Sequence, residues 1–310
     1  MYDIIIVGGG PAGLTAAIYS LRSRFKTLLI EKFILGGQVS IATTIENYPG
    51  FGSGIQGPAL IMEMEKQVRN IENSEIINET VTGIEQKKEL EFAVKTEEKE
   101  YLTKTVIICS GRRYRKLGIE KEDNFIGNGI SYCATCDAPL YKNKEVVVVG
   151  GGDTALEEAL HLAKFAGKVK IIHRRGQLRA TKILQERMFA NNKIEFIQSS
   201  VVTGLVITKN ESLNMQFVSG VNVKNVVTNA VTEVKCNGIF VCIGFEPNTD
   251  FVKSLVWLDT EKYITTDENM QTSLKGIYAA GDCRKKSLKQ VVTACSDAAT
   301  AVFDIEHLLG

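Results

Sequence analysis

The stretch IIIVGGGPAG, residues 4–13, joins a short apolar run to a glycine-rich turn. Residues 14–21 then show helical periodicity, and a second apolar run, residues 27–30, ends at Glu31. This order predicts a βαβ unit whose turn carries the G-x-G-x-x-G pattern of a dinucleotide site. Such a turn lets the backbone approach a pyrophosphate, and the following helix offers unpaired N–H groups to the phosphates. Glu31 stands 18 residues after Gly13, where a carboxylate can accept hydrogen bonds from ribose hydroxyls.

The chain repeats this arrangement further along. The stretch VVVVGGGDTA, residues 146–155, reads as a second strand and turn. A helix is predicted over about residues 156–166, and residues 169–172 form the next predicted strand. His173 takes the position equivalent to Glu31, again 18 residues beyond the last motif position. Two copies of the unit predict two nucleotide-binding domains and electron transfer from one bound cofactor to another.

Arginines replace the acid in the second copy. The chain there has HRR, residues 173–175, with Arg179 one helical turn further on. An acid would repel a 2′-phosphate, whereas arginines bind one through charge-assisted, bidentate hydrogen bonds. The first site is therefore predicted to hold a cofactor with a free ribose, and the second NADP(H). A solvated basic face is the alternative, although the repeat fixes the position of these arginines.

Both copies continue in the same way. Polar stretches at residues 90–104 and 205–235 have strand-like alternation. Each leads to an apolar strand that closes on Cys-x-Gly, at residues 109–111 and 242–244. The predicted fold class is α/β, with two Rossmann-like dinucleotide-binding domains, each with a β-meander.

The composition limits the remaining possibilities. The 310 residues are 44% hydrophobic and 24% charged, which provides a buried core and excludes a disordered chain. Lys plus Arg (37) nearly balance Asp plus Glu (36), which argues against a nucleic acid or an anionic membrane as the main partner. No apolar run approaches the roughly 18 residues of a membrane span, and the N-terminus does not resemble a signal peptide. A cytoplasmic protein with mostly reduced thiols is expected from its seven cysteines.

Cys133 and Cys136 form a C-x-x-C pair, a spacing that brings two thiols within reach of a reversible disulfide. Half of a zinc site is the alternative, but a structural site needs four ligands and no second C-x-x-C exists, so no metal is predicted. Asp137 follows directly, either as a carboxylate that exchanges protons with the thiols or reduced flavin, or as the start of a turn. The remaining cysteines are expected to be core or incidental residues: Cys109, Cys236, Cys242, Cys283 and Cys295.

These motifs resemble those of the low-molecular-weight, bacterial-type thioredoxin reductases, in the same order and over essentially the whole chain. Besides the two glycine turns and the cysteine motif, the resemblance rests on GGQ (36–38), ENYPG (46–50), HRR (173–175) with Arg179-Ala180, and IYAAGD (277–282). It implies a homodimeric thioredoxin-disulfide reductase. Electrons would pass from NADPH through FAD and the Cys133–Cys136 disulfide to oxidised thioredoxin.

The same resemblance implies that the NADPH domain is inserted into the FAD domain. The FAD domain would comprise residues 1–115 and 247–310, and the NADPH domain, which carries the cysteine pair, residues 116–246. The inserted domain is expected to swing about its connections, near residues 116–119 and 245–248, because the nicotinamide and the disulfide cannot occupy the same flavin face at once.

Individual roles also follow from the resemblance. Cys136 would take electrons from the flavin, Cys133 would attack thioredoxin, and Asp137 would move the accompanying proton. The FAD site would comprise Gly8, Gly10, Pro11, Ala12, Gly13, Glu31, Lys32, Gly37, Gln38, Asn47, Gly281, Asp282, Lys289, Gln290 and Val291. The NADPH site would comprise Gly150, Gly152, Asp153, Thr154, Ala155, His173, Arg174, Arg175 and Arg179.

The chain departs from the family pattern at several positions. Asn128 stands where an arginine is frequent and Leu140-Tyr141 where two phenylalanines are frequent, in the region that resembles the thioredoxin-docking surface. Another thioredoxin-like or peroxiredoxin-linked disulfide partner is therefore the alternative substrate. The other departures are Arg112-Arg113 for small residues, Glu120-Lys121-Glu122 for Pro-Gly-Glu, and Lys289 for arginine.

Other flavoproteins of similar fold fit the chain less well. A ferredoxin or flavodoxin reductase would lack the cysteine pair, and glutathione-reductase-type enzymes carry theirs early in the FAD domain. The flavoprotein subunit of an alkyl hydroperoxide reductase would need an N-terminal thioredoxin-like extension. A thiol oxidase that uses O₂ needs no NADPH, which residues 173–175 disfavour, and a non-catalytic NADP sensor would require inert cysteines.

Overall fold

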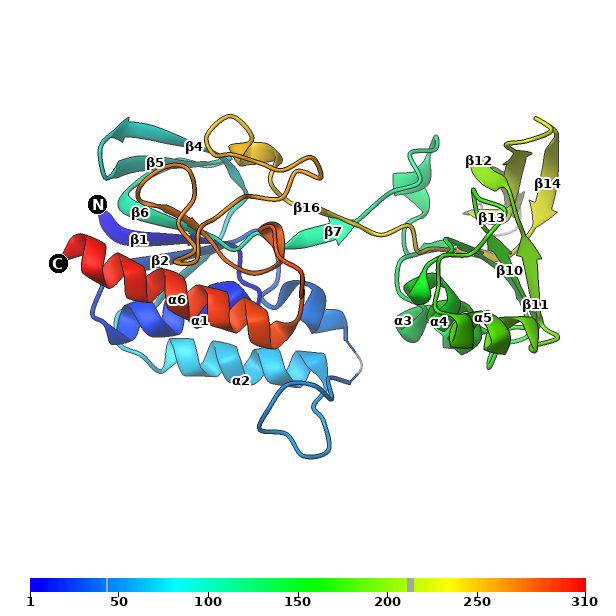
Figure 1. Ribbon diagram of the computed structural model, residues 1–310, viewed down its shortest axis with the longest axis horizontal. Helices are drawn as coiled ribbons and strands as arrows, with labels where there is room; N and C mark the ends of the chain where they lie inside the picture. Colours follow the sequence, from blue (N-terminus) through cyan, green and yellow to red (C-terminus); the bar gives the residue numbers. More distant parts are fainter. Residues whose placement is uncertain (43, 211–214) are drawn as a thin grey trace. The chain divides into compact units, whose positions relative to one another are not determined.

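The computed structural model describes residues 1–42, 44–210 and 215–310, and its chain forms two compact units (Figure 1). Residues 211–214, part of the second polar stretch, lie outside the described residues. The first unit comprises Met1–Arg113 and Glu246–Gly310, and the second comprises Tyr114–Phe245. The chain crosses between them in β7 (Arg112–Tyr114) and β16 (Phe245–Pro247), which pair as a two-stranded sheet.

The first unit is built on a seven-stranded sheet whose order is β3-β2-β1-β6-β5-β4, with β17 also paired to β6. Strands β3, β2, β1, β6 and β17 run parallel, whereas β4, β5 and β6 form an antiparallel meander. The strands are β1 (Tyr2–Val7), β2 (Thr27–Glu31), β3 (Glu75–Asn78), β4 (Val81–Lys88), β5 (Glu91–Thr96), β6 (Glu100–Ile108) and β17 (Ile277–Ala279). The helices are α1 (Pro11–Arg22), α2 (Gly57–Arg69) and α6 (Val291–Leu309), with shorter 3₁₀ turns η1 (Gly37–Ile41), η4 (Asp250–Val252) and η5 (Gly281–Cys283).

Both faces of this sheet are covered, which explains the unbroken apolar run of β1. Ile4 and Ile6 pack into the cluster formed with the three helices, which lie along one face in Figure 1. Ile5 and Val7 point to the other face, where the meander and the η4 region complete a second cluster. The carboxyl ends of the parallel strands therefore meet at one edge, which is the usual place for a ligand in such sheets.

The second unit repeats this plan with a parallel sheet of order β11-β10-β9-β15-β8 and a separate meander, β12-β13-β14. The strands are β8 (Ile130–Ser131), β9 (Glu145–Val149), β10 (Lys168–Ile172), β11 (Ile194–Ile197), β12 (Ser200–Asn210), β13 (Met215–Asn225), β14 (Val231–Lys235) and β15 (Gly238–Val241). The helices are α3 (Ala134–Asp137), α4 (Asp153–Leu162) and α5 (Lys182–Phe189), with 3₁₀ turns η2 (Glu122–Phe125) and η3 (Ala138–Tyr141). Two Rossmann-like units, each with a meander, confirm the predicted fold class.

The helix after the second glycine turn differs from its prediction. It spans Asp153–Leu162 rather than residues 156–166. It begins early because Gly152 serves as its N-cap, and the Leu156 N–H already bonds to the Gly152 carbonyl at 3.2 Å. It ends early because Phe165 and Ala166 both turn back to the Leu162 carbonyl. Within the described ranges, no helix has the length and apolar character that crossing a bilayer requires.

Candidate active site

The first glycine turn contains glycines of two kinds. A Cβ on Gly8 would collide with the Cys109 carbonyl, and one on Gly13 would collide with the Gly8 carbonyl. These two residues are therefore required by the fold itself. Gly10 is different, because the nearest neighbour of a Cβ there would be the Gly36 carbonyl oxygen at 3.9 Å. The space above Gly10 is open, as expected of a cradle for a ligand phosphate.

Glu31 is held against this turn by two hydrogen bonds. Its Oε2 accepts from the Gly9 N–H at 2.6 Å and its Oε1 from the Phe33 N–H at 3.2 Å. The Gly9 carbonyl in turn accepts from the Gly36 N–H at 2.8 Å. These bonds bring the glycine turn, the acid at the end of β2 and the GGQ segment together at one edge of the sheet.

The second glycine turn has the same backbone geometry. Gly150 donates to the Ile172 carbonyl at 3.0 Å, as Gly8 donates to Ile30 at 2.8 Å. A Cβ on Gly150 would collide with the Cys242 carbonyl, whereas among the described residues nothing lies within 4 Å of a Cβ on Gly152. The second turn therefore pairs a glycine required by the fold with an open one, as the first does.

His173 takes the place of Glu31 and behaves differently. Its ring covers Gly151, where any Cβ would collide with it, and only 6% of the residue is exposed. Burial lowers the pKa of His173, and the nearby guanidinium groups of Arg179, Arg174 and Arg175 lower it further. Its buried Nε2 has no hydrogen-bond partner in residues 1–42, 44–210 and 215–310. The three arginines are exposed, so cationic side chains and an unused ring nitrogen surround this turn.

The C-terminal part of the first unit contributes further predicted residues. Asp282, in η5, forms an ion pair with Arg112 at 3.0 Å. Gln38 donates to the Arg112 carbonyl at 3.5 Å. Burial lowers the pKa of Lys289, followed by the charge of Arg112, and the ammonium lies over the Tyr263 ring at 4.2 Å from its centroid. Asp282, Gln38 and Lys289 are thus brought together around Arg112.

Helix α6 begins next to this cluster. Gln290 is its N-cap and forms a capping box with Thr293. Asn47 donates to the Gln290 side chain at 3.0 Å. The structure thus also brings Asn47 and Gln290 together, although they are far apart in the sequence. The remaining predicted residues of the first site lie at the same turns: Pro11 and Ala12 begin α1, Lys32 follows β2, Gly37 lies 3.8 Å from Gly10 (Cβ position to Cα), and Val291 begins α6.

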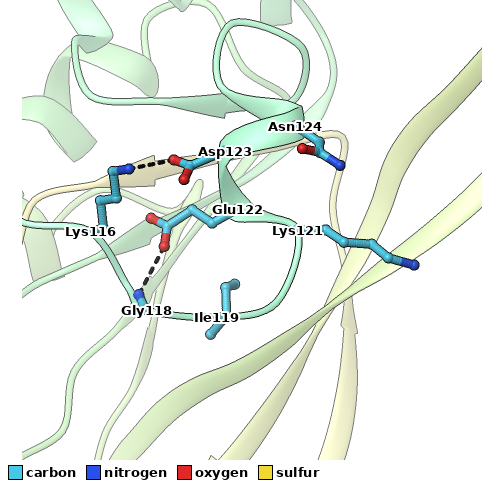
Figure 2. A pocket seen from close by; sticks show the side chains of 7 residues that line it. All are labelled: Lys116, Gly118, Ile119, Lys121, Glu122, Asp123 and Asn124. Carbon is cyan, nitrogen blue, oxygen red and sulfur yellow. Dashed lines mark hydrogen bonds and ion pairs between the residues drawn. The ribbon is translucent and has the colours of Figure 1, made fainter.

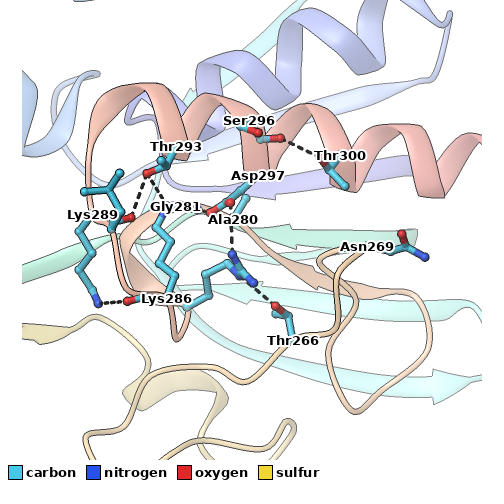
Figure 3. A network of polar contacts seen from close by, with 12 residues as sticks. Thr266, Asn269, Ala280, Gly281, Lys286, Lys289, Thr293, Ser296, Asp297 and Thr300 are labelled. Atoms are coloured by element: carbon cyan, nitrogen blue, oxygen red, sulfur yellow. Dashed lines mark hydrogen bonds and ion pairs between the residues drawn. The ribbon is translucent and has the colours of Figure 1, made fainter. Parts of the chain in front are cut away.

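Sequence reasoning missed the residue that fixes Gly281. Asp297, on α6 and 7% exposed, accepts from the Gly281 N–H at 3.0 Å and from Lys286 at 2.8 Å, and Arg284 contributes a third contact at 3.2 Å (Figure 3). A carboxylate buried with two cations is stable only as a set, because removing one partner leaves an unpaired charge. The available sequence signal was a carboxylate placed among alanines, at Ala294, Ala298, Ala299 and Ala301 of α6.

The predicted redox pair is a disulfide in the structure, with the Cα atoms of Cys133 and Cys136 5.4 Å apart. Both cysteines lie at α3, and the Cys136 N–H donates to the Cys133 Sγ at 3.2 Å. The Ala134 N–H, between them, donates to Glu158 on α4 at 2.5 Å. Asp137 ends α3, and its own N–H bonds to the Cys133 carbonyl at 3.2 Å. The other five cysteines are free thiols.

Two hollows on the second unit contain positions where the chain departs from the family. The first, about 390 Å³, is lined by Lys116, Gly118, Ile119, Lys121, Glu122, Asp123 and Asn124 (Figure 2). The buried Glu122 carboxylate accepts from the Leu117 and Gly118 N–H groups at 2.8 Å each. The second, about 310 Å³, is lined by Gly127, Asn128, Gly129, Leu140, Tyr141, Lys144, Phe217, Val218 and Asn237.

Arg113 lies in β7, within the connection, at a position where the resemblance led us to expect a small residue. Its guanidinium donates to Glu246 at 2.7 Å, to Asn248 at 3.1 Å and to Asp250 at 3.0 Å. These bonds raise the pKa of Arg113 although partial burial opposes them. The Arg113 side chain therefore links the segment that leaves the first unit, at β7, to the segment that re-enters it, at residues 246–250.

Two glycine turns of the dinucleotide type and a C-x-x-C disulfide in one chain define a class, the dinucleotide-dependent disulfide oxidoreductases. Residues 2–298 match the family described as pyridine nucleotide-disulphide oxidoreductase. The chain is 43% identical to a thioredoxin reductase of Peptoclostridium acidaminophilum over 99% of this chain and 96% of the relative. It is 42% identical to that of Bacillus subtilis over 99% and 94% of the two chains.

Solved structures agree with these sequence relatives. A Lactococcus lactis thioredoxin reductase, in a form named the FR conformation, matches with a TM-score of 0.84 at 41% identity and covers 99% of this chain and 98% of its own. A Streptococcus pyogenes thioredoxin reductase matches with a TM-score of 0.67 at 44% identity, covering 100% and 98%. The chain therefore belongs to the pyridine nucleotide-disulphide oxidoreductase family, within its low-molecular-weight thioredoxin reductases. Membership implies a flavin and a nicotinamide cofactor, and it confirms the resemblance inferred from the motifs.

Proposed function

We propose that this protein reduces oxidised thioredoxin, passing electrons from NADPH through FAD to the Cys133–Cys136 disulfide. The observation that carries the proposal is the combination of two glycine turns with different partner residues, Glu31 and His173, and a disulfide that is already formed. When bound, FAD would accept a hydride from NADPH and supply two electrons to the disulfide.

The first unit is the proposed FAD domain. The open space above Gly10 suits a pyrophosphate, and the fixed Glu31 carboxylate suits ribose hydroxyls. Asp282 would bond the ribityl chain, and the Val291 N–H would face the pyrimidine edge of the flavin. The Gln290 N–H, which donates to Thr293 Oγ1 at 3.2 Å in this structure, would share that role when the flavin is bound. The full set is the one predicted from the sequence, from Gly8 and Gly10 to Gln290 and Val291.

The second unit is the proposed NADPH domain. Its open glycine, Gly152, leaves room for a pyrophosphate in the same way as Gly10. The exposed Arg174, Arg175 and Arg179 supply charge for a 2′-phosphate, and the unused Nε2 of His173 offers a further hydrogen bond to the nucleotide. Gly150, Asp153, Thr154 and Ala155 complete this site.

The chain's own chemistry is thiol–disulfide exchange. Two electrons and one proton break the Sγ–Sγ bond and leave a thiolate and a thiol. The Cys133 thiolate, which the Cys136 N–H would stabilise, attacks one sulfur of the partner's disulfide and releases the other as a thiolate. Cys136 then attacks Cys133 Sγ, which frees the reduced partner and restores the original disulfide. Asp137 would accept or return the proton as the charge on Cys136 changes.

The partner would dock beside the redox pair. Leu140 is 67% exposed and Phe217 40% exposed, and both line the hollow that also contains Asn128. This hollow lies directly after the cysteine helix in sequence, because η3 follows α3. We propose thioredoxin as the occupant, with another thioredoxin-like or peroxiredoxin-linked protein as the alternative. A cytoplasmic homodimer is proposed on the same family grounds.

Rapid mixing tests this function directly. NADPH should bleach the flavin absorbance of the purified protein, and oxidised thioredoxin should restore it. A Cys133→Ser, Cys136→Ser double variant is the matched control, since NADPH should still bleach its flavin while thioredoxin should not restore it. Restoration by a peroxiredoxin-linked disulfide but not by thioredoxin would favour the alternative partner. Restoration by thioredoxin in the double variant would refute the proposed route.

A further inference from the structure

Glu158, on the second turn of α4, touches the redox motif from outside it. Its Oε2 accepts the N–H of Ala134, the residue that follows Cys133, at 2.5 Å. Sequence reasoning placed α4 at the nucleotide site and did not include this carboxyl. The contact therefore links the helix after the second glycine turn to the backbone between the two cysteines.

The surroundings of Glu158 contain little to neutralise it. The side chain is half-buried, and no cation lies within ion-pair distance of it in the described part of the chain. Burial raises the pKa of Glu158, the Ala134 N–H opposes that change, and Glu157 on the same helix adds to it. The Cys242 thiol is a further ionisable neighbour, whose pKa burial raises and the Glu158 charge raises further. Asp137, at the end of α3, is a further carboxyl residue and follows Cys136 directly in the sequence.

Three backbone N–H groups of the cysteine motif have partners, and that of Cys133 donates to Ser131 Oγ at 3.1 Å. The Cys136 N–H donates to the Cys133 Sγ at 3.2 Å, whereas the Ala134 N–H is taken by Glu158. Donors and positive charge near a cysteine stabilise its thiolate, and a pair whose reduced form is stabilised in this way becomes a stronger oxidant. A residue that removes a donor and adds negative charge has the opposite effect and makes the pair a stronger reductant.

We propose that Glu158 is a positioning residue that keeps the Cys133–Cys136 dithiol strongly reducing, by withholding the Ala134 N–H from the sulfur atoms and placing a carboxylate at the backbone between the two cysteines. The inference rests on the proposed function to the extent that a thioredoxin reductase needs a dithiol no less reducing than thioredoxin. Two electrons and one proton break the Sγ–Sγ bond and leave a thiolate and a thiol, and Glu158 changes only the stability of these products relative to the disulfide.

The test is a thiol–disulfide equilibrium of the FAD-loaded protein against dithiothreitol, read by alkylation of Cys133 and Cys136. Glu158→Gln is the informative variant, because it keeps an oxygen acceptor for Ala134 and removes only the charge. We expect its equilibrium constant for reduction to rise about tenfold, equal to about 30 mV for a two-electron couple. Glu158→Ala, which also frees the N–H, should shift it further. Glu157→Gln, an exposed neighbour on the same helix, is the matched control and should change it less than twofold.

A pH series distinguishes an electrostatic role from a structural one. Below its own pKa, Glu158 is neutral, as glutamine is, so the difference between the native protein and Glu158→Gln should shrink as the pH falls. A Glu158→Gln constant within twofold of the native one at neutral pH would overturn the inference, and so would a difference that persists unchanged in acid.

The result is separable from the proposed function, since the equilibrium uses neither NADPH nor thioredoxin. If the native protein fails to reduce thioredoxin while Glu158→Gln shifts the equilibrium, the function is refuted and the role of Glu158 stands. If thioredoxin is reduced normally and the equilibrium does not shift, the role of Glu158 is refuted and the function stands.

Discussion

The two glycine turns have nearly the same backbone but different neighbours at the decisive position. In each turn the N–H of the first glycine donates a hydrogen bond to the neighbouring strand, from Gly8 to the Ile30 carbonyl at 2.8 Å and from Gly150 to the Ile172 carbonyl at 3.0 Å. The carbonyl of the second glycine also accepts a backbone hydrogen bond in each turn. Gly9 accepts from the Gly36 N–H at 2.8 Å, and Gly151 accepts from the Arg179 N–H at 2.7 Å. At the end of the following strand, Glu31 accepts a hydrogen bond from its turn, whereas the His173 ring covers Gly151.

The shape of each glycine turn and its preference for one nucleotide are therefore determined by different residues. The backbone bonds and the glycines whose Cβ would collide with a backbone carbonyl, Gly8 and Gly13 in the first turn and Gly150 in the second, fix the shape of each turn. Glu31, at the end of β2, then gives the first turn a negative charge. Arg174, Arg175 and Arg179, which follow β10, give the second turn a positive one. The turns should therefore respond alike to a change in shape and differently to a change in charge.

Filling the open glycine should have the largest effect, and on one cofactor only. Gly10→Val places a side chain where the pyrophosphate must lie, and its φ of −73° permits any residue. The variant should purify folded but without flavin. Gly152→Val, the matched change, should retain the flavin and lose NADPH binding. Absorbance spectra and flavin-to-protein ratios measure the flavin content of Gly10→Val. Flavin bleaching by NADPH measures NADPH binding by Gly152→Val. A yellow Gly10→Val protein with normal flavin content would show that the first turn does not hold FAD.

Removing the arginines should abolish the preference for NADPH. Each lost charge-assisted hydrogen bond costs about 1.5–3 kcal/mol, which is roughly tenfold or more in the NADPH KM. The Arg174→Ala, Arg175→Ala double variant should approach equal use of NADPH and NADH, with NADH kinetics nearly unchanged. If the double variant keeps the native preference, the 2′-phosphate is recognised elsewhere.

Neutralising Glu31 should have a smaller effect. In Glu31→Gln the amide oxygen can still accept from the Gly9 N–H, so the turn keeps its shape and only the strength of the ribose contact changes. We expect flavin to bind about tenfold more weakly, since a hydrogen bond to a charged group contributes more than a neutral one. Flavin release under dilution measures it. Loss of the fold in Glu31→Gln would mean that the acid is structural.

The local parts of this architecture were predictable from sequence, because they are repeated within short windows. Both βαβ units, the cysteine pair and the acid-to-histidine replacement follow from spacings of under thirty residues. The start of α4 was missed because Gly152 caps the helix directly, and a glycine motif does not show where its helix begins. Asp297 and Glu158 were missed for a different reason: no motif or fixed spacing links them to their partners, the N–H groups of Gly281 and Ala134, which only the packing of α6 and α4 brings to them. A carboxylate on a helix indicates burial only once the packing is known.

An anaerobic titration with NADPH tests the central claim most directly, because it counts the electrons that the chain accepts. The native protein should take up one equivalent for the flavin and a second for the Cys133–Cys136 disulfide. The Cys133→Ser, Cys136→Ser variant should take up only the first. Uptake of a single equivalent by the native protein, equal to that of the variant, would show that the disulfide does not receive electrons from the nucleotide and would contradict this account.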